Sequence, residues 1–119
     1  MKYLIMIQMN PSVRAMWEGL TDEQRAGGYQ IHKDMVSRLE ASGELVASES
    51  LSDVSLGKRL AVKDGVVTTT DGPFAEVKEY LAGFYLVDCE NIDRAIEHAA
   101  RLPEAELGLV EVRPVVELP

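Results

Sequence analysis

The sequence predicts an α+β fold in which two strand-helix-strand units share one sheet, with a β-hairpin inserted between them. Three observations support this prediction. Residues 3–9 are apolar at almost every position, residues 22–42 follow a helix-capping motif, and Asp64-Gly65 separates two runs rich in β-branched residues. These patterns are typical of a buried strand, a helix and a tight hairpin, respectively.

Length and composition indicate a single folded domain over residues 1–119. Of these residues 46% are hydrophobic and 27% are charged, which is ordinary for a globular protein. The 20 Asp and Glu against 12 Lys and Arg give a net charge of −8. This sign is wrong for binding a phosphate backbone or an anionic membrane. We therefore expect no nucleic acid and no membrane among the partners.

The single cysteine, Cys89, cannot form an internal disulfide, and no Cys/His cluster has the spacing of zinc ligands. Its neighbours Asp88 and Glu90 disfavour a thiolate, so we expect an unreactive thiol. His98 is expected on the flank of its helix, without a role. The chain also lacks a phosphate-binding glycine loop, and nothing calls for a metal or a cofactor. A reducing cytoplasm is the expected location.

The first unit begins with residues 3–9, which we expect to form a strand covered on both faces or central in the sheet. Residues 1–10 lack the small-residue cleavage site of a signal peptide, so this segment is interpreted as a strand. Residues 11–19 contain Pro, Ser, Gly and a single Trp17. They predict a loop or a short helical turn anchored by the indole.

The first long helix is predicted over residues 22–42. Thr21 is its N-cap, Gln24 completes a capping box, and Gly43 ends it. The pair Gly27-Gly28 weakens the first half by about 1 kcal/mol per glycine. This half is therefore expected to kink, to start late, or to let another group approach the backbone closely.

The second half of the chain supplies the remaining strands. Residues 44–51 alternate imperfectly, as in a second strand. Residues 58–63 and 66–70 flank Asp64-Gly65 and predict the hairpin. An apolar and aromatic strand is expected over residues 81–89.

A second helix begins at the N-cap Asn91 and ends at Pro103. Its apolar residues recur at helical spacing and predict one buried stripe: Ile92, Ala95, Ile96, Ala99 and Leu102. A last strand is expected over residues 107–116, with Val110 and Val112 buried.

This order of elements corresponds to a ferredoxin-like βαβ-βαβ arrangement with an inserted hairpin. Both helices would cover one face of a four-stranded sheet, and the chain has nothing left to cover the other. We therefore expect a homodimer formed by sheet-to-sheet packing.

His32 is the most informative candidate for chemistry. At helical spacing it points in the mean direction of four residues: Tyr29, Met35, Val36 and Leu39. One interpretation is a core or pocket-edge histidine that needs a single hydrogen bond. The other is a general acid or base tuned by burial and a carboxylate. The sequence leaves both open.

Asp71 begins the compact turn at residues 71–74, where turn chemistry alone explains an Asp. The alternative is that Asp71 partners His32 or orients a substrate. Lys78 and Tyr80 follow within a short charged run, which is either a solvated face or the lining of a polar pocket.

Several segments together carry a family resemblance: Met1-Lys2-Tyr3-Leu4, Leu39 to Gly43, Asp64-Gly65, the nonapeptide Asp71-Gly72-Pro73-Phe74-Ala75-Glu76-Val77-Lys78-Glu79, Gly83-Phe84-Tyr85-Leu86-Val87-Asp88, and Val110-Glu111-Val112-Arg113-Pro114-Val115. On these residues the chain resembles the YCII-related family, specifically its DGPF branch, over nearly its whole length. The resemblance implies a ferredoxin-like fold assembled as a dimeric α/β barrel, with a pocket in each protomer.

Simpler members of this family are thought to use a His and Asp pair in that pocket, and His32 looks like the counterpart of their His. Their Asp lies in an Asp-Pro turn after the second helix, where this chain has Leu102-Pro103. Asp71 would have to take the place of that carboxylate. Members of this branch are often encoded beside extracytoplasmic-function sigma factors, which implies a regulatory or accessory role as an alternative.

Two functions follow from these observations. The first is a cofactor-free enzyme of lyase or isomerase type, with His32 as general base on a small cyclic or aromatic substrate. Asp71, Lys78 or Tyr80 would orient the substrate, and Tyr29 would contact it beside His32. The second is a dimeric binding or stress-accessory protein that holds a small molecule without converting it.

Overall fold

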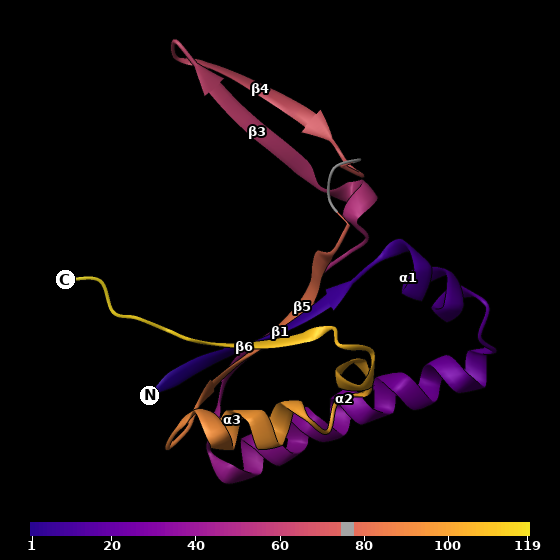
Figure 1. Ribbon diagram of the computed structural model, residues 1–119, viewed down its shortest axis with the longest axis vertical. Helices are drawn as coiled ribbons and strands as arrows, with labels where there is room; N and C mark the ends of the chain where they lie inside the picture. Colours follow the sequence, from indigo (N-terminus) through magenta and orange to yellow (C-terminus); the bar gives the residue numbers. More distant parts are fainter. Residues whose placement is uncertain (75–77) are drawn as a thin grey trace.

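The computed structural model describes residues 1–74 and 78–119 and shows an α+β fold (Figure 1). Residues 75–77, in the nonapeptide, lie outside the described part. The described elements in chain order are β1 (Lys2–Met9), α1 (Pro11–Glu18), α2 (Asp22–Ser42), β2 (Leu45–Ser50), the 3₁₀ helix η1 (Val54–Leu56), β3 (Lys58–Lys63), β4 (Val66–Asp71), β5 (Tyr80–Asp88), α3 (Ile92–Ala99), the 3₁₀ helix η2 (Pro103–Leu107) and β6 (Val110–Pro114).

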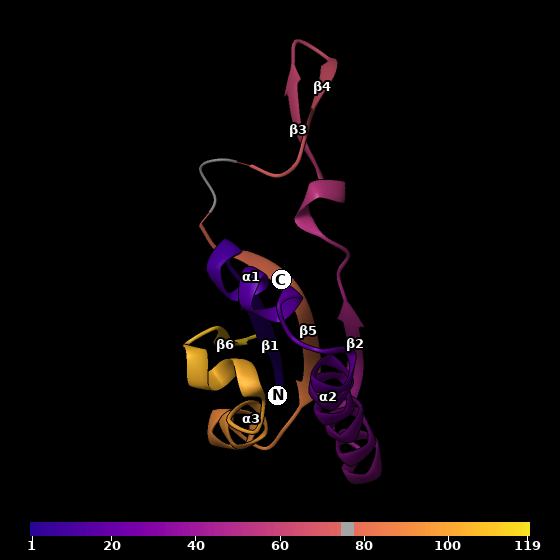
Figure 2. The same ribbon diagram turned by 90° about the vertical axis from the view of Figure 1, so that its right-hand side faces the viewer.

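The main sheet has the strand order β2-β5-β1-β6, and every neighbouring pair is antiparallel. Helices α2 and α3 lie on one face of this sheet (Figures 1 and 2). Order, direction and helix placement are consistent with the predicted ferredoxin-like α+β fold. Strands β3 and β4 form a separate two-stranded sheet, which is the predicted hairpin.

The core lies between the sheet and the two helices. Tyr3, Ile5 and Ile7 alternate along β1 and are buried on the helix side, as the period of a strand requires. They pack in one cluster with Met35 and Leu39 of α2. Burying a side chain such as Ile5 or Leu39 stabilises the fold by about 1.5–3 kcal/mol. The opposite face of the sheet is not covered by a helix of the described protomer.

The structure confirms the predicted boundaries of helix α2, residues 22–42. The Thr21 hydroxyl accepts from the Gln24 amide at 3.1 Å, and the Gln24 side chain accepts from the Thr21 amide at 2.9 Å. At the other end Gly43 adopts a left-handed conformation with φ 76° and closes the last turn. The helix continues through its glycine pair without interruption.

Helix α1 is longer than the loop or short turn predicted for residues 11–19. Asn10 caps it by accepting from the Val13 amide at 2.8 Å. Trp17 near its end contacts Tyr29 edge to face, with ring centroids 5.3 Å apart. A Cβ on Gly28 would lie 3.0 Å from the Trp17 ring. Gly28 therefore lets the indole approach the backbone of α2, one of the outcomes expected of the glycine pair.

The predicted buried stripe of α3 is partly wrong. Ala95, Ala99 and Leu102 are buried, but Ile92 and Ile96 are 38% and 48% exposed. His98, expected on the flank, is only 2% exposed. The buried face of α3 runs through Ala95, His98 and Ala99, with His98 and Ala99 three and four residues after Ala95. The helix ends at Ala99 and not at Pro103 as predicted, so Leu102 is buried in the turn that follows it. The helix presents this face because His98 forms a hydrogen bond to Glu44 in the interior.

Strand β6 is shorter than the predicted strand over residues 107–116, because η2 occupies Pro103–Leu107 and Gly108 turns the chain with φ 69°. Among the described residues, no helix combines the length and apolar character needed to cross a membrane.

Candidate active site

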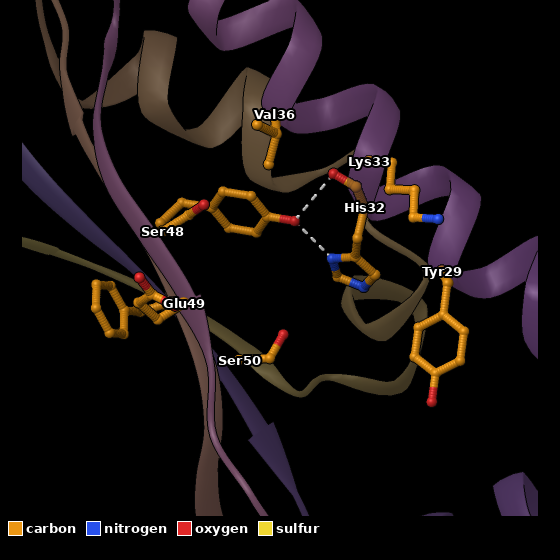
Figure 3. A pocket seen from close by; sticks show the side chains of 9 residues that line it. Tyr29, His32, Lys33, Val36, Ser48, Glu49 and Ser50 are labelled. Atoms are coloured by element: carbon orange, nitrogen blue, oxygen red, sulfur yellow. Dashed lines mark hydrogen bonds between the residues drawn. The ribbon is translucent and has the colours of Figure 1, made fainter.

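His32 is held by hydrogen bonds at both ring nitrogens. Its Nε2 lies 2.8 Å from Oε1 of Glu104, and its Nδ1 lies 2.6 Å from the hydroxyl of Tyr85. The imidazole points from α2 toward the sheet, as Figure 3 shows. The three side chains form one continuous chain of hydrogen bonds from a strand, through a helix, to the turn after α3.

The chemistry of the two end groups determines which atom carries the proton in each of these hydrogen bonds. A carboxylate can only accept, so Nε2 of His32 donates to Glu104. In the neutral imidazole Nδ1 then accepts from the Tyr85 hydroxyl. Burial, followed by the negative charge of Glu104 and opposed by Arg38, raises the pKa of Tyr85 to about 12. Tyr85 therefore keeps its proton at neutral pH and can donate it.

Local structure places the three groups together. Tyr85 is opposite Ile5 in the sheet and faces the helices from the middle of β5. His32 lies one turn before the buried Met35 of α2. Glu104 is the second residue of η2, which begins at Pro103 after a turn at residues 100–102 that follows α3. The Pro103 turn thus brings a carboxylate back to α2 across 72 positions of sequence.

A pocket of about 480 Å³ opens beside His32 and Tyr85, a volume within the range of small-molecule sites. Figure 3 shows its wall from α2 on one side and β2 on the other. Its remaining lining residues are Tyr29, Lys33, Val36, Ser48, Glu49, Ser50 and Phe84. A second pocket of about 290 Å³ has His32, Glu104 and Trp17 in its lining. His32 therefore separates two cavities.

The site residues predicted from the sequence lie in four different places. His32 and Tyr29 both line the larger pocket. Tyr80 lines a different pocket, of about 260 Å³, that it shares with Tyr29. Lys78 is exposed just before β5. Asp71 ends β4 on the hairpin, where its Oδ1 lies 2.5 Å from Nζ of Lys58. In the described protomer the carboxylate bonded to His32 is Glu104.

Glu104 is a site residue that the sequence pattern did not single out, because the expected carboxylate was an Asp immediately before Pro103. The carboxylate lies immediately after the proline and has one more methylene group. The available signal was an acidic residue beside Pro103, at the point where the chain leaves the second helix.

A second histidine and glutamate pair lies elsewhere in the core. Nε2 of His98 is 3.1 Å from Oε1 of Glu44, and Arg94 binds both oxygens of Glu44 at 3.1 and 3.2 Å. Burial raises the pKa of Glu44, but hydrogen bonds from Arg94, Ser42, Cys89 and His98 together outweigh it and lower the pKa to about 2.

Cys89 completes this second cluster. Burial, followed by the hydrogen bond to Glu44 and its negative charge, raises the pKa of the Cys89 thiol to about 11. The prediction of an unreactive thiol is consistent with this environment. The donor atoms of Glu44, Cys89 and His98 lie within 4.8 Å of one another and could hold a metal ion. The guanidinium of Arg94 already occupies both carboxylate oxygens, however, and this favours an ion pair over a metal site.

Fold and site together define a small α+β protein with a pocket beside a hydrogen-bonded histidine and carboxylate. The chain belongs to the YCII-related family, because the model of the YCII-related domain matches residues 1–119. It is similar to the uncharacterized protein R00369 of Rhizobium meliloti (strain 1021), with 32% identity over 120 residues. The match covers 97% of this chain and 92% of that protein.

Proposed function

We propose that this protein is a cofactor-independent enzyme of lyase or isomerase type, which moves a proton on a small cyclic or aromatic substrate. The observation that carries the proposal is the chain of hydrogen bonds from Tyr85 through His32 to Glu104, ending at a pocket of about 480 Å³. Such a network suits general acid and base catalysis because the central imidazole can accept a proton at one ring nitrogen while it donates one from the other.

In the proposed step the Tyr85 hydroxyl takes a proton from the bound substrate while it gives its own proton to Nδ1 of His32. The imidazolium that forms is stabilised by Glu104, which accepts from Nε2 at 2.8 Å. The proton then returns by the same route. Returning it to another atom of the substrate completes an isomerisation, and returning it to a leaving group completes an elimination.

The pocket lining supports the proposed class of substrate. Tyr29 and Val36 offer aromatic and apolar surface for a ring. The ammonium group of Lys33 and the hydroxyl of Ser48 can bind an oxygen that becomes negative when the proton leaves. A ring that carries a carbonyl next to the reacting C–H bond combines both features.

The assembly and the branch of the family belong to the same proposal. We infer a sheet-to-sheet homodimer because the uncovered face of the sheet carries four apolar side chains: Leu4, Met6, Phe84 and Leu86. Membership of the DGPF branch and a cytoplasmic location remain predictions from the sequence.

A binding or accessory protein without catalysis is the second candidate. The observation that favours it is that both ring nitrogens of His32 already have partners inside the protomer. A histidine held in this way can shape a pocket without taking a proton from its ligand.

Deuterium exchange distinguishes the two candidates. Small cyclic and aromatic ketones are incubated with the protein in D₂O, and the loss of their exchangeable C–H signals is followed by proton NMR. Catalysis predicts exchange that falls by about 10²–10⁴-fold in His32→Gln and in Tyr85→Phe. Gln30→Ala is the matched control, because Gln30 is exposed on the same helix and bonds only locally to Asp34.

Exchange that is equal in wild type and in His32→Gln would refute catalysis by this route. If ketones raise the melting temperature of wild type without any exchange, the pocket binds without converting, and the second candidate stands.

A further inference from the structure

The protomer has more surface than a compact domain of its size. Its radius of gyration is 16.4 Å, against about 13.5 Å expected for 119 residues. Its accessible surface is 8274 Å², against about 6,400 Å² expected for a monomer of 13.1 kDa. The excess of about 1,900 Å² is more than twice what one partner contributes to a standard interface.

Much of this extra surface belongs to the hairpin of β3 and β4, residues 58–71, which we call the arm. All residues of its two strands are exposed. Figures 1 and 2 show the arm projecting from the body of the protein. A two-stranded hairpin is at best marginally stable by itself in water.

One face of the arm is apolar. The register places Leu60 opposite Thr69 and Val62 opposite Val67, and residues directly opposite share a face. Leu60, Val62 and Val67 are 65%, 65% and 58% exposed. Contiguous exposed side chains of this kind mark an interaction surface. The opposite face is more polar and carries two basic residues, two threonines and two smaller apolar residues: Arg59, Lys63, Thr68, Thr70, Ala61 and Val66.

The two ends of the arm are held together at its root. The amide of Gly72 donates to the carbonyl of Gly57 at 2.9 Å and ties the two ends of the arm together. A Cβ on Gly72 would overlap the carbonyl oxygen of Val54, so only glycine allows this close approach. The guanidinium of Arg59 lies 4.1 Å from the centre of the Phe74 ring. These contacts tie the two ends of the arm to each other and to η1.

We propose that the arm docks, by its Leu60, Val62 and Val67 face, on a second copy of this chain. In Figure 1 the arm rises from one end of the sheet on the side away from α2 and α3, so a copy seated on the uncovered sheet face lies within its reach. The excess accessible surface of about 1,900 Å² per protomer is comparable to the area that each partner buries in a permanent dimer.

Charge complementarity supports the same occupant. The arm carries three basic residues, Lys58, Arg59 and Lys63, against two acidic ones, Asp64 and Asp71, and has a net charge of +1. Because the net charge of the whole chain is −8, the residues outside the arm carry a net charge of −9. An arm of positive charge is therefore attracted to the acidic body of another copy.

The test is the self-association of full-length variants, measured by sedimentation equilibrium over a range of concentrations. Leu60→Asp combined with Val62→Asp places charge on the apolar face, and we expect the dissociation constant to rise at least about 100-fold. Thr68→Asp combined with Thr70→Asp adds the same charge to the opposite face of the arm, on β4. This matched control is expected to change the constant only a few-fold.

Hydrogen exchange gives a second measurement on wild-type protein. Amides of β3 and β4 should become protected as the concentration rises through the dissociation constant. If the double Asp variant fails to fold, Leu60→Thr with Val62→Thr keeps the strand propensity and should weaken the dimer about 10-fold. The proposal rests on the sheet-to-sheet homodimer proposed above, and wild type that stays monomeric would overturn both. Equal dissociation constants for the variants of the two faces, or arm amides that stay unprotected in a dimer, would overturn the docking of the arm alone.

Discussion

Replacing Glu44 with Gln should lower the free energy of unfolding, and the size of this loss should depend on pH. Glu44 is 15% exposed and accepts hydrogen bonds from Arg94 and His98. The glutamine keeps the size of the side chain but removes its charge. Arg94 and His98 are then left with a neutral partner in a mostly buried place.

The magnitude follows from the pKa. The pKa of Glu44 falls from its ordinary 4.5 to about 2 in the folded protein. A shift of this size corresponds to about 3 kcal/mol of folding free energy. Because the folded value is the lower one, the contribution is present in full above about pH 4.5 and is lost as the pH falls toward 2.

The assay is urea unfolding of wild type and Glu44→Gln at pH 7 and at pH 3, at one protein concentration. The difference in unfolding free energy between the two proteins should shrink by about 2 kcal/mol at pH 3. Glu97→Gln is the matched control: Glu97 binds the same Arg94 at 2.9 Å but is 63% exposed. It should change stability by less than about 1 kcal/mol. A Glu44 difference that is the same at both pH values would refute the reasoning.

Two further predictions concern a thiol and a pair of glycines. Cys89, buried with a thiol pKa of about 11, should react with a disulfide reagent at pH 8 about 100-fold more slowly than free cysteine; a rate within a few-fold of free cysteine, followed by absorbance, would contradict this. Gly27→Ala should raise the unfolding free energy by about 0.5–1 kcal/mol, because nothing lies within 4 Å of the added Cβ. Gly28→Ala should lower it, because its Cβ meets the Trp17 ring at 3.0 Å. Urea unfolding measures both, and the reverse order would contradict the packing argument.

Local features of the fold were predictable because short-range chemistry determines them. The capping box of Thr21 and Gln24 places the start of α2 without any tertiary information. Asp64-Gly65 does the same for the hairpin, since both residues adopt positive φ, 52° and 76°. The exposed face of α3 was not predictable in this way. Hydrophobic spacing favours burying Ile96, but burying His98 satisfies the Glu44 carboxylate from another part of the chain.

In the candidate site, too, some features follow from local sequence and others depend on residues far away in the chain. The inward direction of His32 follows from helical spacing within α2, and the structure places it at a pocket. Its partners Tyr85 and Glu104 are 53 and 72 positions away in sequence. No local pattern links residues at such separations, and the sequence signal that favoured Glu104 over Asp71 was its position directly after Pro103.

The two pairs of histidine and glutamate differ in their neighbours, and this difference decides what each can do. Arg94 occupies both oxygens of Glu44, and the pair with His98 is enclosed in the core. A proton on His98 has no route to a ligand there, so this pair contributes stability. For the other pair, Oε2 of Glu104 has no hydrogen-bond partner among the described residues, and His32 borders two cavities. Charge that forms on His32 can then be offset at Glu104 when a ligand arrives. Loss of Glu104 is therefore expected to reduce the proposed proton transfer at little cost in stability, whereas loss of Glu44 is expected to lower stability with little effect on that transfer.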